Sequence, residues 1–201
     1  RIRRYTNESA AVAYTLVQEN FETNSKRSTN YRFGVDYDIN NRTSFGVLVN
    51  GFSSPYSEDG NYENKFDGSG QMVDSVVYAG SDLRNHSNNN AVSVILTNKF
   101  MRPGNELNLS FDYLNYNVES RQVSQSDSYL TDGSFKEKYI LISNSDYSAK
   151  IYSSKLDFSN KIFGDWVLET GLQTIFSFRN NIGEYYNKDG NLDIPNALLS
   201  N

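Results

Sequence analysis

The sequence predicts an all-β fold, an antiparallel up-and-down meander, for this chain of 201 residues. Three observations lead to that prediction. Apolar and polar residues alternate along several stretches, which is the repeat of a strand whose two faces meet different surroundings. Short turns containing Asn, Pro or Gly, centred near Asn41, Gly104 and Gly164, alternate with long polar stretches. No stretch shows the period of an amphipathic helix.

The clearest alternation lies between residues 105 and 117, where four apolar side chains point one way and three polar ones the other: Leu107, Leu109, Phe111 and Tyr113 against Asn108, Ser110 and Asp112. A strand of about ten residues is long enough to cross the hydrocarbon core of a bilayer when it is tilted. If the other hairpins repeat this one, the chain is a segment of a large transmembrane β-barrel.

The remaining elements follow in order. Membrane-length strands are expected at 11–21, 31–39, 43–52, 91–100, 105–117, 147–162 and 166–179. A polar link is expected at 22–30, and long loops near 53–90, 119–146 and 180–201, with strand-like islands at 72–79 and 139–142. Tight turns therefore fall at one end and long loops at the other, as in outer-membrane barrels. The expected organisation is a single barrel segment over residues 1–201, with about seven membrane-length strands and no plug domain.

Composition agrees with this prediction. Aromatic residues make up 14%, with 15 Tyr and 12 Phe, which suits the aromatic girdles of barrels and also the contact surfaces of sugar-binding β-sandwiches. The mean hydropathy of -0.63 is no obstacle, because a barrel strand is apolar only at alternate positions. There is no Cys, and the net charge is -5. A nucleic-acid partner is not expected, since the basic residues cluster only at Arg1–Arg4. No signal peptide opens the sequence, so an exported protein would be represented by a mature or excised segment.

The stretch from Tyr31 to Gly46, YRFGVDYDINNRTSFG, resembles a hairpin of the barrel half of TonB-dependent outer-membrane receptors from Bacteroidetes-type bacteria. The stretches 109–116, 155–160 and 168–173 are similar to the same family. The resemblance implies a barrel of about 22 strands in the outer membrane of a Gram-negative cell, importing large nutrients. It also implies three partners: outer-membrane lipid, the remaining strands and plug of the same receptor, and an inner-membrane energy-transducing complex. Neither a plug nor an energy-coupling box is seen in the sequence.

The barrel prediction assigns the side chains to two environments. Lipid is expected to surround Phe33, Val35, Leu109, Phe111, Leu156, Phe158, Leu172 and Phe176, whereas Asp36, Ser110, Asp112, Asp157, Glu169 and Gln173 are expected to line the lumen. Ligand contacts are expected from aromatic residues in the long loops, namely Tyr56, Tyr62, Tyr129, Tyr185 and Tyr186. Loop-on-loop packing is the alternative role for these tyrosines. Trp166 is expected to anchor the chain at the membrane interface.

The sequence predicts no catalytic activity. His86 is the single histidine and stands in a polar stretch, where a solvated role is expected. No cofactor is expected, and the one calcium candidate is Asp189, Asn191 and Asp193, whose spacing also fits ordinary turn chemistry. Asp36 and Asp38 share a strand face, which a polar lumen explains without catalysis. The alternative to a barrel segment is a secreted, soluble β-sandwich binding module, for example for glycans, in which the aromatic faces would form a core.

Overall fold

The computed structural model describes residues 2–7, 14–68, 73–164 and 166–200, which form one antiparallel sheet. Its strands are β1 (Ile2–Asn7), β2 (Tyr14–Lys26), β3 (Thr29–Asn40), β4 (Thr43–Gly68), β5 (Val73–Lys99), β6 (Glu106–Leu130), β7 (Phe135–Lys161), β8 (Val167–Asp189) and β9 (Leu192–Pro195). The predicted all-β meander is therefore confirmed. Within the described part of the chain, no helix is long and apolar enough to cross a membrane.

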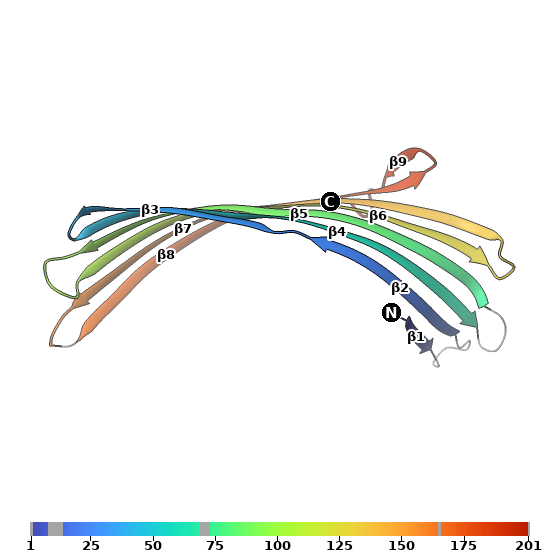
Figure 1. Cartoon of the computed structure of the whole chain (residues 1–201), viewed down its shortest axis with the longest axis horizontal. Helices are drawn as coiled ribbons and strands as arrows, with labels where there is room; N and C mark the ends of the chain where they lie inside the picture. Colours follow the sequence, from blue (N-terminus) through green and yellow to red (C-terminus); the bar gives the residue numbers. More distant parts are fainter. Residues whose placement is uncertain (1, 8–13, 69–72, 165, 201) are drawn as a thin grey trace.

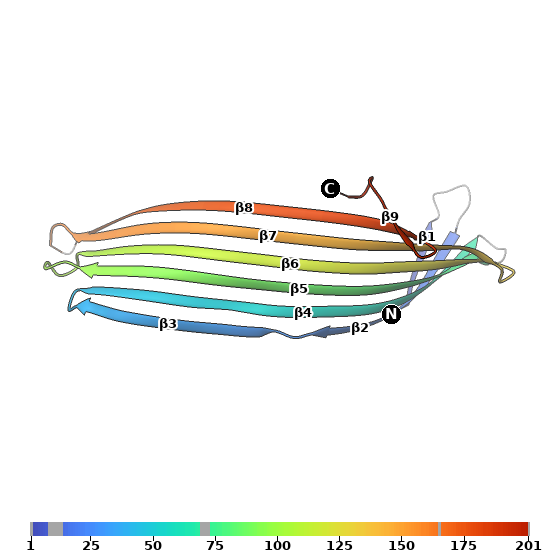
Figure 2. The same ribbon diagram turned by 90° about the horizontal axis from the view of Figure 1, so that it is seen from above.

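The strands lie side by side in the order β1-β2-β4-β5-β6-β7-β8-β9, with β3 also paired to β4 (Figure 2). β2 and β3 lie end to end along the same edge of β4, because Lys26 pairs with Tyr56 and Thr29 pairs with Ser53. Seven strands of the described chain have at least 12 residues. Since β2 and β3 lie end to end, these seven strands occupy six neighbouring positions across the antiparallel sheet.

The long loops predicted near 53–90, 119–146 and 180–201 are wrong. The β4–β5 ladder continues from Thr43 paired with Asn98 to Phe66 paired with Ser75, and the β5–β6 and β6–β7 ladders are similarly long. The predicted link at 22–30 shrinks to residues 27 and 28. The physical reason is that the backbone ladder does not depend on apolar side chains. A strand with polar residues on both faces shows no hydropathy alternation and looks like a loop in the sequence.

The tight turns were predicted correctly. At the β5–β6 turn, the amide of Asn105 donates to the carbonyl oxygen of Arg102 at 3.1 Å. Gly104 has φ = 86°, which a residue with a Cβ adopts only with strain, so the Pro-Gly pair fits this turn. The turns after β3, β5 and β7 all lie at the same end of the sheet (Figure 1).

No second layer covers the described sheet, which arches and twists along its length (Figure 1). The chain exposes 14273 Å², against about 9,600 Å² expected for a compact monomer of this mass. Among the described hydrophobic residues, only Ile142 and Ala149 are buried. A β-sandwich packs two sheets over a shared core. The sandwich alternative is therefore not favoured, because its apolar faces would have to meet each other.

Candidate functional site: the two faces of the wall

The strand register places the predicted lipid-facing side chains on one face. One cross-strand row runs Phe33, Val49, Val92, Tyr113, Tyr152 and Phe176. A second row on the same face, closer to the tight turns, runs Tyr37, Phe45, Leu96, Leu109, Leu156 and Leu172. All eight residues assigned to lipid share this face, and all six assigned to the lumen lie on the other. The predicted separation is confirmed, and we call these the outward and the inward face.

The apolar residues on the outward face are bare even in the middle of the sheet. β6 is paired on both sides, by β5 and β7. A side chain that is exposed on β6 is therefore exposed because nothing packs on that face of the sheet, and not because the strand lies at an edge. Phe111 is nevertheless 50% exposed and Leu109 is 42% exposed. Contiguous exposed apolar surface of this kind is typical of a membrane or partner interface.

Aromatic residues border this apolar band. On the side away from the tight turns, the rings of Tyr113 and Tyr152 are 5.0 Å apart, and those of Tyr152 and Phe178 are 6.2 Å apart. On the turn side, Phe163 and Trp166 are 79% and 76% exposed. Two aromatic borders around an apolar band correspond to the girdles of membrane barrels. The position of Trp166 at the turn side agrees with its predicted anchoring role.

The sheet divides into two halves along its strands. We call the part next to the tight turns the turn half: residues 31–53, 88–117, 148–161 and 167–180. The rest, which includes β2 and the long hairpin arms, is the extended half. In the turn half, the inward face carries charge, and Lys155 Nζ lies 2.6 Å from Asp157 Oδ2. A charged inward face opposite an apolar outward face is the arrangement of a barrel wall with a wet lumen.

The extended half has the opposite arrangement. Its inward face over β5, β6 and β7 holds only uncharged residues, mainly Ser, Asn, Gln and Tyr, at alternate positions of 77–87, 118–128 and 139–147. Its outward face holds the charges Arg84, Arg121, Glu119 and Asp146. These four lie on the same face as Phe111, because the register of both ladders is unbroken between them.

The five tyrosines predicted in loops all lie on strands, so that part of the prediction is wrong. Tyr56, Tyr62 and Tyr185 occupy the inward face, in register with Asn85, Ala79 and Ser143. Tyr129 and Tyr186 occupy the outward face, in register with Val76 and Ile142. The structure therefore brings three of the five to the lumen side and leaves two outside. Their role in binding a ligand stays a prediction.

Two of the inward tyrosines have perturbed acidity. The hydroxyl of Tyr56 donates to the carboxylate of Glu58, and this hydrogen bond raises the pKa of Tyr56. Burial raises the pKa of Tyr62, and the negative charge of Glu22 adds to the effect. Both phenols are therefore held as neutral donors in the extended half, next to carboxylates.

The inward face also carries an aromatic run at the boundary between the two halves. The ring of Tyr116 lies 6.3 Å from that of Phe52 and 6.1 Å from that of Tyr147. These three residues lie on β4, β6 and β7, farther from the tight turns than the charged part of the inward face. A hollow of about 310 Å³ lies farther out on the same face, lined by hydroxyl and amide side chains, including Tyr62, Ser81, Gln122, Ser124, Ser126 and Tyr139.

The other candidates are placed as follows. His86 lies in β5, not in a loop, and its Nε2 is 2.9 Å from Ser53 Oγ. Asp189, Asn191 and Asp193 surround the two-residue turn between β8 and β9, where Lys188 Nζ lies 3.9 Å from Asp193 Oδ1. The described residues hold no group of three or more His, Cys, Asp or Glu that could bind a metal. The geometry of the calcium candidate is that of a hairpin turn.

Sequence reasoning missed the charged cluster on the outward face. Arg84, Glu119, Arg121 and Asp146 all fell within predicted loops, where their relative positions were undefined. Pairing the two polar stretches as strands would have revealed the cluster, because alternate positions would then have aligned these charges.

The geometry is that of one wall of a membrane β-barrel, with an apolar outward band, aromatic borders and a polar lumen side. A family model described as the outer membrane protein beta-barrel family matches residues 98–201, slightly more than half of the chain. The chain belongs to that family, and it is located in the outer membrane. No curated protein matches the chain.

Proposed function

We propose that this chain is part of the barrel of a TonB-dependent receptor that takes up nutrients across the outer membrane, and that it has no catalytic role. Outer-membrane β-barrel architecture is established by the fold and the family. The receptor assignment goes further, and the hairpin from Tyr31 to Gly46 carries it.

The geometry gives this hairpin motif a physical basis. Asp36 on β3 pairs with Gly46 on β4, and a Cβ added to Gly46 would meet Asp36 Oδ1 at 2.5 Å. The Asp36 side chain therefore lies over Gly46, and a larger residue at that position would have to displace it. The same arrangement recurs at Asp157 and Gly171, where the added Cβ would meet Asp157 Oδ1 at 2.7 Å. The recurrence of this Asp–Gly pairing supports the use of the hairpin residues as evidence of kinship.

Further strands of the same receptor are the proposed partners at the two sides of the sheet. In the described structure, β3 pairs only with β4, and β8 pairs with β9 only between Tyr186 and Asp189. Free strand edges recruit other strands, and a barrel removes them by closure. The plug and the inner-membrane energy-transducing complex are proposed from the family resemblance alone.

Energy coupling can be tested in living cells. A strain that lacks the intact receptor should lose growth on the nutrient that the receptor imports, and a strain that lacks the inner-membrane energy-transducing protein should show the same loss. Site-specific cross-linking should join the intact receptor to that protein. If the receptor supports growth equally well without the energy-transducing protein, it is a passive channel and the proposal fails.

The inward tyrosines give a second test, on ligand contact. Replacing both Tyr62 and Tyr185 by Ala should weaken uptake by about 2- to 10-fold for each ring removed, because one aromatic contact contributes about 0.5–1.5 kcal/mol. The matched control replaces Tyr129 and Tyr186 by Ala on the outward face, and uptake should stay at the wild-type level. Equal losses in the two double variants would show that the rings act through packing alone.

A further inference from the structure

The outward face of the extended half contains like charges placed directly opposite each other. Arg84 on β5 pairs with Arg121 on β6, and in the next row Glu119 on β6 pairs with Asp146 on β7. Like charges at directly opposed positions destabilise a sheet. Two such conflicts in adjacent rows indicate a functional site, because a sequence selected for folding alone would alternate the signs.

The ion pairs of the fold relieve this conflict only in part. Arg84 Nη2 lies 2.9 Å from Asp82 Oδ2 and 3.3 Å from Asp59 Oδ1. No salt bridge or hydrogen bond involves the guanidinium of Arg121 among the described residues. The strong donor groups of Arg121 therefore remain open to a ligand.

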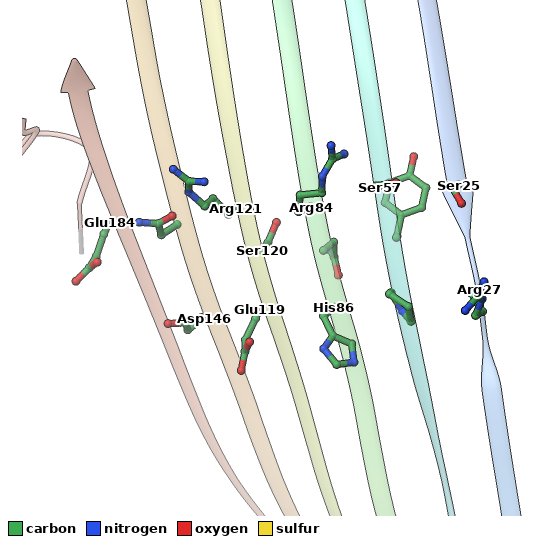
Figure 3. A pocket seen from close by; sticks show the side chains of 14 residues that line it. Ser25, Arg27, Ser57, Arg84, His86, Glu119, Ser120, Arg121, Asp146 and Glu184 are labelled. Carbon is green, nitrogen blue, oxygen red and sulfur yellow. The ribbon is translucent and has the colours of Figure 1, made fainter. Parts of the chain in front are cut away.

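These residues line one depression of about 740 Å³. Figure 3 shows Arg84 and Arg121 on neighbouring strands, with His86, Glu119 and Asp146 one row away, and Arg27 and Glu184 at the two sides. The depression lies on the face that carries the apolar band. The side chains that line it include three arginines, three carboxylates and one histidine.

The height of the depression relative to the bilayer follows from residue counting. A tilted strand uses about 9–11 residues to cross the hydrocarbon core, so a crossing that starts at Glu106 ends near Tyr116. Glu119 and Arg121 follow within five residues, roughly 7–12 Å beyond the hydrocarbon for a tilt of about 45°. Headgroups occupy about 5–8 Å of each leaflet. The depression therefore lies at and just beyond the outer edge of the headgroup layer, within reach of a large headgroup and clear of the lipid tails.

We propose that this depression binds the phosphate-bearing headgroup of an outer-leaflet lipid, with the phosphate held between Arg84 and Arg121. Two planar guanidinium groups donate in pairs to phosphate oxygens, which makes arginine the preferred residue for phosphate. The phosphate removes the repulsion between the two arginines. Glu119 and Asp146 lie one row nearer the turn half. A lipid is favoured over a soluble anion because the site continues the lipid-facing surface.

The proposal depends on the barrel orientation of the wall and not on nutrient uptake, so lipid retention tests it separately. The intact membrane protein is reconstituted into phosphatidylcholine nanodiscs that contain a minor fraction of a diphosphorylated glycolipid. Native mass spectrometry then counts retained glycolipid. The wild type should retain it in preference to its dephosphorylated form, and Arg84→Gln with Arg121→Gln should reduce retention at least tenfold.

The matched control removes two other positive charges from the outward face of the extended half, with Lys65→Gln and Lys138→Gln. This variant should retain glycolipid as the wild type does. Arg121→Lys keeps the charge but loses the planar fork, and should show an intermediate loss. Heat-modifiable gel mobility checks that each variant is folded.

Three outcomes would overturn the proposal. The arginine double variant could retain the glycolipid, or the lysine control could lose it to the same extent, which would indicate a diffuse charge effect. Inorganic phosphate could bind to the wild type while the glycolipid is not retained, which would make the site one for a soluble anion. Copurification of a protein in place of lipid on this face would identify a protein-docking surface.

Discussion

The turn half and the extended half of the sheet are built on the same ladders but face different solvents. In the turn half, apolar residues such as Phe111 lie outward and charged residues such as Asp112 lie inward. In the extended half, Arg121 and Glu119 lie outward on the same strand, whereas Ser120 and Gln122 lie inward. Since the backbone pairing is continuous, the difference lies in the medium around each half. Hydrocarbon surrounds only the turn half.

Arginine substitutions at three positions should distinguish these environments, and they should give the largest differences in the free energy of unfolding. Phe111→Arg puts a cation into hydrocarbon and should lower the free energy of unfolding by about 2–4 kcal/mol, whereas Ser110→Arg on the inward face should cost far less. Gln125→Arg, outward in the extended half, should cost about 0–1 kcal/mol, since a depth-dependent penalty vanishes outside the core.

The measurement is urea unfolding of the intact protein in lipid bilayers, followed by gel mobility. Equal tolerance of arginine at Phe111 and Ser110 would mean that the outward face does not meet lipid. A large loss at Gln125 would mean that the membrane reaches farther up the sheet than the apolar band.

Alanine substitutions at two glycines on the outward face should test the difference between the two halves through side-chain packing. A Cβ added to Gly51, at the end of the turn half, would collide with the carbonyl oxygen of Asn89 and the hydroxyl of Tyr31. Gly51→Ala should therefore destabilise the sheet by about 1–3 kcal/mol, as overpacking usually does.

Gly80 in the extended half is the matched control. The nearest atom to an added Cβ there is the carbonyl oxygen of Gly60, at 3.9 Å, which is ordinary contact. Gly80→Ala should leave the unfolding midpoint in urea within experimental error of the wild type. If Gly51→Ala is equally silent, the neighbouring Tyr31 ring moves aside and the close packing of β3, β4 and β5 is looser than the structure indicates.

The sequence predicted the turn half well, for a physical reason. Hydrocarbon outside and water inside require strict hydropathy alternation, so Leu107 to Tyr113 could be assigned to faces without coordinates. The tight turns were also predictable, because Pro103-Gly104 and Asn40-Asn41 have few other uses. The resemblance of residues 31–46 added the membrane context.

The extended half could not be predicted in the same way. Ser124, Gln125 and Ser126 meet water on both faces, so no period in hydropathy marks them as a strand. Their pairing depends on backbone hydrogen bonds, and its register continues that of the same strands in the turn half. The candidate tyrosines were therefore assigned to loops, and the opposed charges at Arg84 and Arg121 were not seen as neighbours.

The smallest expected effect lies at the far tip of the extended half, in the turn between β6 and β7. The amide of Ser134 donates to Asp132 Oδ1 at 2.8 Å, and the hydrogen bond from the Ser134 side chain followed by that from its amide lowers the pKa of Asp132. Because the folded-state pKa is lowered, the stabilisation is present above the usual value of about 3.9 and is lost as pH falls through the lowered value. In an NMR titration, the Ser134 amide should shift with a midpoint below 3.9 or so. Asp132→Asn should abolish that titration. A midpoint at or above the usual value would show that the tip is frayed and the carboxylate of Asp132 is solvated.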